Sequence, residues 1–420
     1  LQIQQNTDRM IANYNSFSIA NGETVRFIQP SSSSMALNRV VGVSPSEIFR
    51  TLTANGQIFL VNPNGVVFGR TAQVDVGGLM ASTLNITDED FKNGNFIFSG
   101  DGGRIENYGV LSSKAGGYII LLSPQIRNEG MIVSQLGTTV LASGETIRLL
   151  NLDGEGLISV IIDQAVSENL ESADFAIENL GTIEAQGGQV IITAKTLDDV
   201  FNHAINNEGV IEAKSFCRNG GTISLLANDD IYAAGRIEAD GDIRMMSYDG
   251  DVVHQVSFIE RALKGNVITN GGNFQGYAGR DYIVKNGTVI DSGSGIIDIF
   301  AGRDILLGSL SDDLVTAFTW DYLFGDRGYR FTEFGYYNIE NESLVYNPLT
   351  TGYDIGVDQV SVVSEAGSFY GDGEVGLYTQ FTGPGGEVFR YYTDPALNPE
   401  GNDHVELAGN VYGWEDMIGL

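Results

Sequence analysis

The sequence is poor in cysteine, proline and basic residues, and each scarcity limits what the protein can be. Its only cysteine is Cys217, so a disulfide within the chain is impossible, although secreted proteins of this size often form them. The lack of disulfides suits export as an extended chain through a narrow pore, and it suits a cytosolic origin equally well. With 23 Lys and Arg against 54 Asp and Glu, the formal net charge is −31. Such a charge repels phosphate backbones and argues against nucleic-acid binding.

Long apolar runs and a start signal are also absent. No apolar run approaches the roughly 20 residues that a helix needs to span a bilayer. The chain begins at Leu1, without an initiator methionine or a basic-then-apolar signal segment, so we expect a processed or recloned fragment of a longer protein. Glycine, by contrast, is abundant. The 54 glycines against 8 prolines indicate many tight corners between short strands rather than a disordered linker.

The residue types that usually carry catalysis or bind metals form no pattern typical of an enzyme. His203, His254 and His404 are isolated and lack metal-ligand spacing. Asp198 and Asp199 are adjacent, but neighbours on a strand point to opposite faces, so adjacency does not create an acid–base pair. A phosphate-binding Gly-x-x-x-x-Gly-Lys motif is absent. We therefore predict no catalytic residue, no cofactor and no metal site.

A repeat runs through the middle of the chain. Its pattern is Ile-x-Asn-x-Gly followed by an alternating apolar segment, and its copies begin at Ile105, Ile126, Ile177, Ile205 and, in degenerate form, Ile231. The first and second copies are 21 residues apart, the third and fourth 28, and the fourth and fifth 26. Later, Ala-Gly-Arg-Asp at 278–281 recurs at 301–304, a spacing of 23 residues. Periods in this range are typical of solenoid proteins.

Apolar residues within each copy alternate with period two, as in residues 189–194 and 222–227. This is the spacing of a β-strand with one face in a core. Strands so short cannot bury a face alone, so successive coils must stack. The predicted fold is all-β, a right-handed parallel β-helix that rises about 4.8 Å per coil. We expect the repeated asparagines to form a structural ladder of hydrogen-bonded amides: Asn107, Asn128, Asn179 and Asn207.

Helical signals are few, so we expect helices and β-hairpins only as short excursions from the solenoid. Residues 44–47 (Ser-Pro-Ser-Glu) have the pattern of a capping box with proline at the first helical position. Residues 87–90 and 196–199 also resemble helix starts, and 163–176 is a candidate helical segment between coils. The aromatic-rich residues 310–420 are expected to form a separate β module or a cap on the solenoid. A glycan-binding aromatic surface is the sharper alternative for that segment.

A four-residue turn is the most informative local feature. Asn62, Pro63, Asn64 and Gly65 place at each position a residue that a type I turn favours. Segments in a characteristic order surround this turn: residues 15–19, 22–30, 36–42, 48–49, 77–79, 81–86 and 90–91.

In this order and spacing, the segments resemble the N-terminal secretion domain of filamentous-haemagglutinin-like exoproteins, the passengers of two-partner secretion in Gram-negative bacteria. The resemblance is dense over about residues 1–124, repeat-like beyond them and absent after about residue 309. The family's Asn-Pro-Asn-Gly element maps onto residues 62–65. A second short Asn-containing element of the family has no clear counterpart here.

The resemblance implies a secretion domain at residues 1–249, with an N-terminal cap, followed by further β-helix coils at 250–309. It implies an adhesin-like exoprotein, not an enzyme, exported through the periplasm and outer membrane to the cell surface. Its partner would be a POTRA-containing outer-membrane transporter, and residues 62–65 would be the recognition or folding element. Glycans or proteins of a host or of the environment are the implied ligands.

Two rival interpretations stay open. The first is a parallel β-helix carbohydrate-active enzyme, a polysaccharide lyase or glycosidase, which requires acids and a base to converge in a groove along one face. The second is a purely structural surface filament protein without a specific receptor.

Overall fold

The computed structural model describes residues 1–307 except 153–156, 170–172, 216–219, 256–265, 285–287, 293–294 and 304, and beyond them only the backbone of seven strands between Tyr329 and Tyr392. The chain divides into two compact units. The first comprises residues 1–231 with 238–244, and the second comprises residues 232–237 with 245–420.

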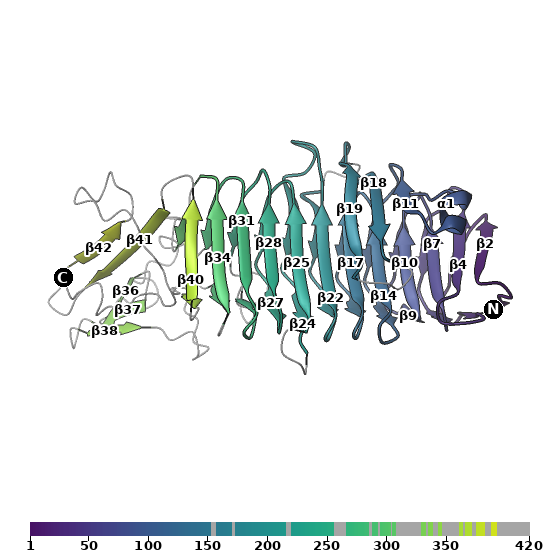
Figure 1. Ribbon diagram of the computed structural model, residues 1–420, viewed down its shortest axis with the longest axis horizontal. Coiled ribbons are helices and arrows are strands. Elements are labelled where there is room, and N and C mark those ends of the chain that lie inside the picture. Colours follow the sequence, from purple (N-terminus) through teal and green to yellow (C-terminus); the bar gives the residue numbers. More distant parts are fainter. Residues whose placement is uncertain are drawn as a thin grey trace. The chain divides into compact units, whose positions relative to one another are not determined.

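In the first unit, successive turns of the chain add strands in rotation to three parallel sheets, here called sheets A, B and C (Figure 1). Sheet A contains β1 (Gln2–Gln4), β3 (Thr24–Ile28), β6 (Thr51–Ala54), β9 (Gln73–Val76), β13 (Val110–Ser113), β16 (Met131–Val133), β21 (Thr182–Glu184) and β24 (Val210–Ala213). Sheet B contains β2 (Arg9–Tyr14), β4 (Met35–Val40), β7 (Gln57–Val61), β10 (Gly78–Ser82), β14 (Tyr118–Leu122), β17 (Thr138–Ser143), β22 (Gln189–Ala194) and β25 (Thr222–Ala227). Sheet C contains β5 (Ser46–Ile48), β8 (Val66–Phe68), β12 (Ile105–Asn107), β15 (Ile126–Asn128), β20 (Phe175–Asn179) and β23 (His203–Asn207). The predicted parallel β-helix is confirmed.

Strand pairing follows the repeat read from the sequence. Ile105 pairs with Ile126, Ile126 with Ile177 and Ile177 with Ile205, each one coil from the next. These isoleucines are almost fully buried, with at most 1% of their surface exposed. Burying such a side chain contributes about 1.5–3 kcal/mol relative to leaving it in water. The repeat therefore records which side chains stack inside the solenoid.

The glycine of the repeat is required by close approach of neighbouring coils. A Cβ atom on Gly130 would lie 2.2 Å from the carbonyl oxygen of Gly109, and one on Gly181 would lie 2.1 Å from that of Gly130. No side chain fits at such distances. The stacked glycines Gly109, Gly130, Gly181 and Gly209 each follow a sheet C strand at the same position, where the chain leaves that sheet.

A second apolar core lies outside the solenoid, on sheet B. It is covered by helix α1 (Asp88–Asn93) and by an antiparallel sheet of β11 (Phe96–Ser99), β18 (Thr146–Leu150) and β19 (Ser159–Gln164) (Figure 1). Phe59 of sheet B meets Phe91 and Phe96 with ring centroids 5.3 and 5.8 Å away. The helix start predicted at residues 87–90 is confirmed, because Thr87 accepts a capping hydrogen bond from the Asp90 backbone N–H.

Three other helical expectations are wrong. Residues 44–47 do not start a helix, because Ser46 begins β5 and its N–H donates to the Gly65 carbonyl, 3.0 Å away. Thr196 forms a parallel bridge with Val166, and a turn follows it. The described parts of 163–176 contain the end of β19 and the start of β20, and no helix. In each case pairing with another segment satisfies the backbone groups that a helix would have used.

The second unit is also built from parallel strands. Its pairs include β29 (Val252–His254) with β32 (Tyr282–Val284), and then β35 (Ile305–Leu307) and β41 (Val375–Thr382). Two further sets are β30 (Asn266–Ile268), β33 (Val289–Asp291) and β39 (Ser361–Val363), and β31 (Phe274–Ala278), β34 (Ile296–Ala301) and β40 (Ala366–Gly371). Three strands contain residues of both units: β26 (Ile231–Ala233), β27 (Arg236–Ala239) and β28 (Ile243–Ser247). Antiparallel pairing joins β36 (Tyr329–Thr332), β37 (Gly335–Asn338) and β38 (Ser343–Tyr346), and it joins β42 (Val388–Tyr392) to β41.

Ala278 pairs with Ala301, so the later echo in the sequence also marks one coil. The aromatic cluster expected after Ser309 and the thiol of Cys217 lie outside the residues whose side chains are described. Within the described part of the chain, no helix has the length and apolar character that crossing a bilayer demands.

Candidate functional site

The Asn62–Gly65 turn joins β7 of sheet B to β8 of sheet C. The Gly65 N–H donates to the Asn62 carbonyl at 3.1 Å, which closes the turn. Asn64 has a negative φ, as a type I rather than a type II turn requires. Gly65 has a φ of 115°, which a residue with a side chain adopts only under strain.

Asn62 is fully buried and uses both ends of its amide. Its Nδ2 donates to the Ser44 carbonyl and to Ser46 Oγ, each 3.0 Å away. Its Oδ1 accepts from the backbone N–H of Asn64 at 3.0 Å and from Asn64 Nδ2 at 2.9 Å. The side chain therefore ties the turn to the coil that precedes it.

The neighbouring asparagine extends the same connection. Asn64 is exposed, yet its Nδ2 also donates to the Gly42 carbonyl at 2.8 Å. On the other side, the Pro63 carbonyl accepts from the Gly103 N–H at 2.7 Å, and Val66 donates to the Arg104 carbonyl at 3.1 Å. The turn is thus bonded to a preceding coil and to a following one, and it sets the register of both.

The four asparagines predicted as a ladder lie in one row along sheet C, and all are fully buried. Asn107 Nδ2 donates to Asn128 Oδ1 at 2.8 Å, Asn128 donates to Asn179 at 2.7 Å, and Asn179 donates to Asn207 at 2.6 Å. An amide can both donate and accept, so one side chain per coil continues the row without a charge.

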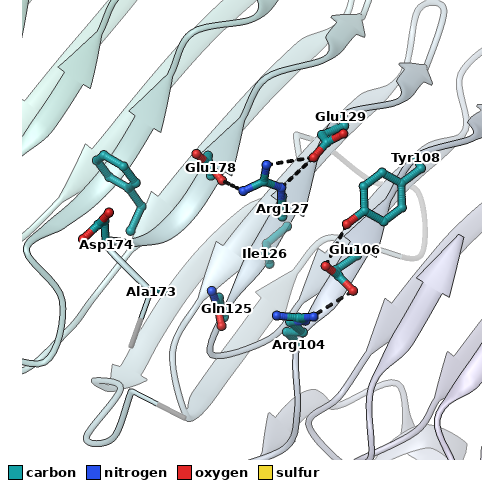
Figure 2. A pocket seen from close by; sticks show the side chains of 11 residues that line it. Arg104, Glu106, Tyr108, Gln125, Ile126, Arg127, Glu129, Ala173, Asp174 and Glu178 are labelled. Atoms are coloured by element: carbon teal, nitrogen blue, oxygen red, sulfur yellow. Dashed lines mark hydrogen bonds and ion pairs between the residues drawn. The ribbon is translucent and has the colours of Figure 1, made fainter. Parts of the chain in front are cut away.

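Sequence reasoning missed a polar groove of about 390 Å³ on the outer side of sheet C (Figure 2). Its lining residues come from three coils: Arg104, Glu106, Tyr108, Gln125, Ile126, Arg127, Glu129, Ala173, Asp174, Phe175 and Glu178. A signal for it was present, because Glu106, Arg127 and Glu178 all occupy the second position of the Ile-x-Asn repeat. Strand pairing places these three side chains next to one another.

Arg127 is the centre of the groove. Its guanidinium donates to Glu129 at 2.8 Å and to Glu178, while Arg104 Nε lies 3.2 Å from Glu106. Burial raises the pKa of Glu178, and the positive charge of Arg127 opposes that rise. Acids do converge on one face, as the enzyme interpretation requires. Three of them, however, are each engaged by an arginine rather than left as a free acid and base.

The histidines lie in different settings. His203 Nδ1 is 3.2 Å from Asp230 in the first unit. His254 is fully buried in the second unit, its Nε2 is 2.6 Å from the Tyr282 hydroxyl, and its Nδ1 has no partner. Burial lowers the pKa of His254 to about 3, so its imidazole is neutral at physiological pH. Among the described residues, no group of three or more His, Cys, Asp or Glu side chains is placed to hold a metal ion.

Comparison with known proteins decides the family. Residues 1–245 match the family model described as the TPS secretion domain, where TPS denotes two-partner secretion. The chain belongs to this family. Its TPS domain covers the whole solenoid of the first unit, including the Asn62–Gly65 turn, the asparagine ladder and the groove.

Two curated relatives from Haemophilus influenzae are named heme/hemopexin-binding protein. One is 31% identical over 238 residues, which is 54% of this chain and 25% of the relative. The other is 27% identical over 285 residues, which is 64% of this chain and 29% of the relative. The chain therefore spans about a quarter of the length of these relatives.

The fold has a counterpart among solved structures. The crystal structure of the HMW1 secretion domain from Haemophilus influenzae superimposes with a TM-score of 0.57 at 22% identity, over 75% of this chain and 89% of that one. At this identity the likeness speaks to the fold alone. It supports the β-helical architecture of the TPS domain.

Proposed function

We propose that this chain is the N-terminal part of an adhesin-like exoprotein, and that its TPS domain is recognised by a POTRA-containing outer-membrane transporter and nucleates folding outside the cell. Family membership supports export by two-partner secretion. Each coil that forms buries its inner face on the coil before it, so folding at the cell surface draws the chain outward without ATP.

Within this proposal, the Asn62–Gly65 turn acts by fixing the first coils rather than by touching the transporter in the folded state. The support is the burial of Asn62, whose side chain is closed off from any partner once the coils have formed. Hydrogen bonds from its side-chain amide reach Ser44 and Ser46, which lie 18 and 16 residues earlier in the chain. A buried amide left without partners costs about 1–3 kcal/mol for each group, enough to slow formation of the first coils.

A binding role for the exported protein is favoured over an enzymatic one. The curated relatives carry names that describe binding, although the chain covers only a quarter of their length. The acids of the groove on sheet C are held by Arg104 and Arg127, which leaves Glu106, Glu129 and Glu178 poorly suited to proton transfer.

Export and refolding of asparagine variants test the turn. Asn62→Ala removes the two side-chain hydrogen bonds that join the turn to the coil before it and two more within the turn, so we expect secretion with the cognate transporter to fall to background while synthesis continues. Refolding of the purified chain from denaturant should slow in parallel. Asn64→Ala leaves the Asn62 bonds to Ser44 and Ser46 intact and should have the smaller effect. The exposed Asn6→Ala variant is the matched control and should be exported normally.

The two readouts separate the mechanisms. If Asn62→Ala refolds at the wild-type rate but is not exported, the asparagine is a contact for the transporter and the turn role is wrong. Normal export of Asn62→Ala would remove the turn from the mechanism altogether.

A further inference from the structure

The groove on sheet C has an alternating polar floor. Glu106 on β12, Arg127 on β15 and Glu178 on β20 pair in register, so a carboxylate, a guanidinium and a carboxylate follow one another across three coils (Figure 2). A cavity of about 390 Å³ lies above this row. That volume lies in the range of small-ligand sites, about 300–1,000 Å³.

The floor is partly dehydrated and held rigidly. The side chains of Glu106, Glu129 and Glu178 are only 12%, 24% and 20% exposed. Arg127 bonds both Glu129 and Glu178, and the Tyr108 hydroxyl donates to Glu106 at 2.9 Å. Groups fixed in this way lose little rotational freedom when a ligand arrives, which lowers the cost of binding.

The polar groups retain capacity for a ligand. Each ionised carboxylate has about four lone-pair sites, more than its bonds to arginine and tyrosine occupy. A hydroxyl group can therefore donate to Glu106 or Glu178 without displacing an arginine. Gln125, which also lines the groove, adds an amide that both donates and accepts.

The charge pattern selects among ligand classes. Four acids and two arginines line the groove, which gives a net charge of −2 and disfavours anions. A cation is disfavoured at the centre, because Arg127 lies between the acids. Neutral hydroxyl groups suit the carboxylates and the guanidinium alike, because a hydroxyl donates to a carboxylate and accepts from a guanidinium. The rings of Tyr108 and Phe175 add apolar surface to the lining, with Arg70 over the Tyr108 ring and His203 beside the Phe175 ring.

We propose that this groove binds a neutral oligosaccharide, with Glu106, Arg127 and Glu178 as its hydrogen-bonding floor. The site lies in the TPS domain itself, far in sequence from the aromatic-rich residues 310–420. The proposed sugar binding goes beyond the export role of the domain and does not depend on that role. In this arrangement the TPS domain remains a binding module after it has been exported.

Binding of the purified 420-residue chain to immobilised oligosaccharides tests the proposal. The probes are neutral glucose, galactose and mannose oligomers, uronic acid oligomers as the anionic class, and glucosamine oligomers as the cationic class. We expect a neutral series to bind. Affinity for it, measured by calorimetry, should fall about tenfold or more in Arg127→Gln, which removes charge-assisted donors from the floor.

The matched control is Lys114→Gln, which removes a cation paired with Asp75 on sheet A, away from the groove. It should bind as the wild type does. Glu178→Gln should also weaken binding, and circular dichroism of each variant checks that the solenoid is intact. The proposal is overturned if no neutral oligomer binds, if the anionic or cationic series binds more tightly, or if Arg127→Gln and Lys114→Gln behave alike. None of these results bears on secretion through the transporter.

Discussion

A buried row of side chains in the first unit and an ion-paired row in the second each join successive coils, and they differ in chemistry. In the first unit the row is the buried, uncharged ladder from Asn107 to Asn207, with hydrogen bonds of 2.6–2.8 Å. In the second unit the row is ionic, with its arginines at the surface and its carboxylates largely buried. Arg280 Nε is 3.0 Å from Asp251, and the Arg303 guanidinium binds Asp281 through two nitrogen atoms.

The difference shows how each chemistry limits where a ladder is placed. The asparagine amides carry no net charge, so full burial costs little once every donor and acceptor is paired. The arginine side chains remain 47% and 60% exposed, which avoids for them the large cost of removing a charge from water, while the largely buried aspartates are compensated by these arginines. We therefore expect the buried ladder to contribute more to stability and to be insensitive to salt.

The second unit also buries a titratable group, which the asparagine ladder avoids. His254 lies inside the solenoid between the rings of Phe274 and Tyr282, with centroids 6.1 and 5.3 Å away. The first ladder is therefore independent of pH near neutrality, whereas the core of the second unit is not.

The largest effect is expected from Asn128→Ala, which interrupts the buried ladder in its middle. It leaves the Asn107 donor and the Asn179 acceptor buried without a partner, so the local free energy of unfolding should fall by about 3 kcal/mol. Hydrogen exchange at β12, β15 and β20 measures the loss. Asn207→Ala, at the end of the row, should cost about half as much because fewer partners are orphaned. Equal effects, or a loss under about 1 kcal/mol, would contradict the importance given to the ladder.

An intermediate effect is expected from acid on the second unit. The pKa of His254 is about 3 in the folded state against 6.5 in the unfolded state, so the unfolded state binds the extra proton. The stability that depends on neutral His254 is therefore fully present above pH 6.5 and is lost as pH falls toward 3. Between pH 7 and pH 5 the loss should be about 2 kcal/mol.

His254→Phe isolates this contribution, because phenylalanine fills similar space and does not titrate. Hydrogen exchange at β29 and β32, corrected for the intrinsic pH dependence of exchange, gives the local stability at both pH values. The variant loses the bond to Tyr282 at every pH, so only the change between the two pH values is compared. A pH dependence that survives in His254→Phe would assign it to other groups.

The smallest effect is expected from the surface ladder. Arg303→Gln removes an ion pair whose guanidinium is 60% exposed and whose Asp281 carboxylate is 10% exposed. Because glutamine can still donate a hydrogen bond to Asp281, the cost should stay near about 1 kcal/mol at low salt. At about 1 M salt the difference from the wild type should vanish, because the Debye length shrinks to about 3 Å. A salt-dependent Asn128→Ala, or a salt-independent Arg303→Gln, would erase the distinction between the two ladders.

Several features were accessible from the sequence for a definable reason. The Ile-x-Asn-x-Gly repeat predicts the register of sheet C, because in a solenoid one position of the repeat is one position in space. The same rule places Asn107 beside Asn128. The repeat also places the residues of the groove floor side by side, because Glu106, Arg127 and Glu178 share its second position. Their variable chemistry hid them, as a repeat is recognised by what stays constant.

The wrong helix predictions also have a physical cause. The capping pattern at 44–47 is a local signal. No helix forms there because Ser46 makes hydrogen bonds with Asn62 and Gly65, which lie 16 and 19 residues away. Likewise, residues 163–176 contribute to β19 and β20 instead of forming a helix. Helix propensity depends on the residues of one short segment. Strand pairing gives the backbone groups of that segment hydrogen-bond partners from distant parts of the sequence.

The sequence by itself determined the coil period, the inward faces and the row of asparagines, because all three follow from a short pattern repeated along one axis. Tertiary structure alone decided the outer core around Phe59, the opening above Arg127 and the neutral state of His254. Those features depend on which distant residues exclude water from a side chain, and exclusion of water is a property of the assembled coils.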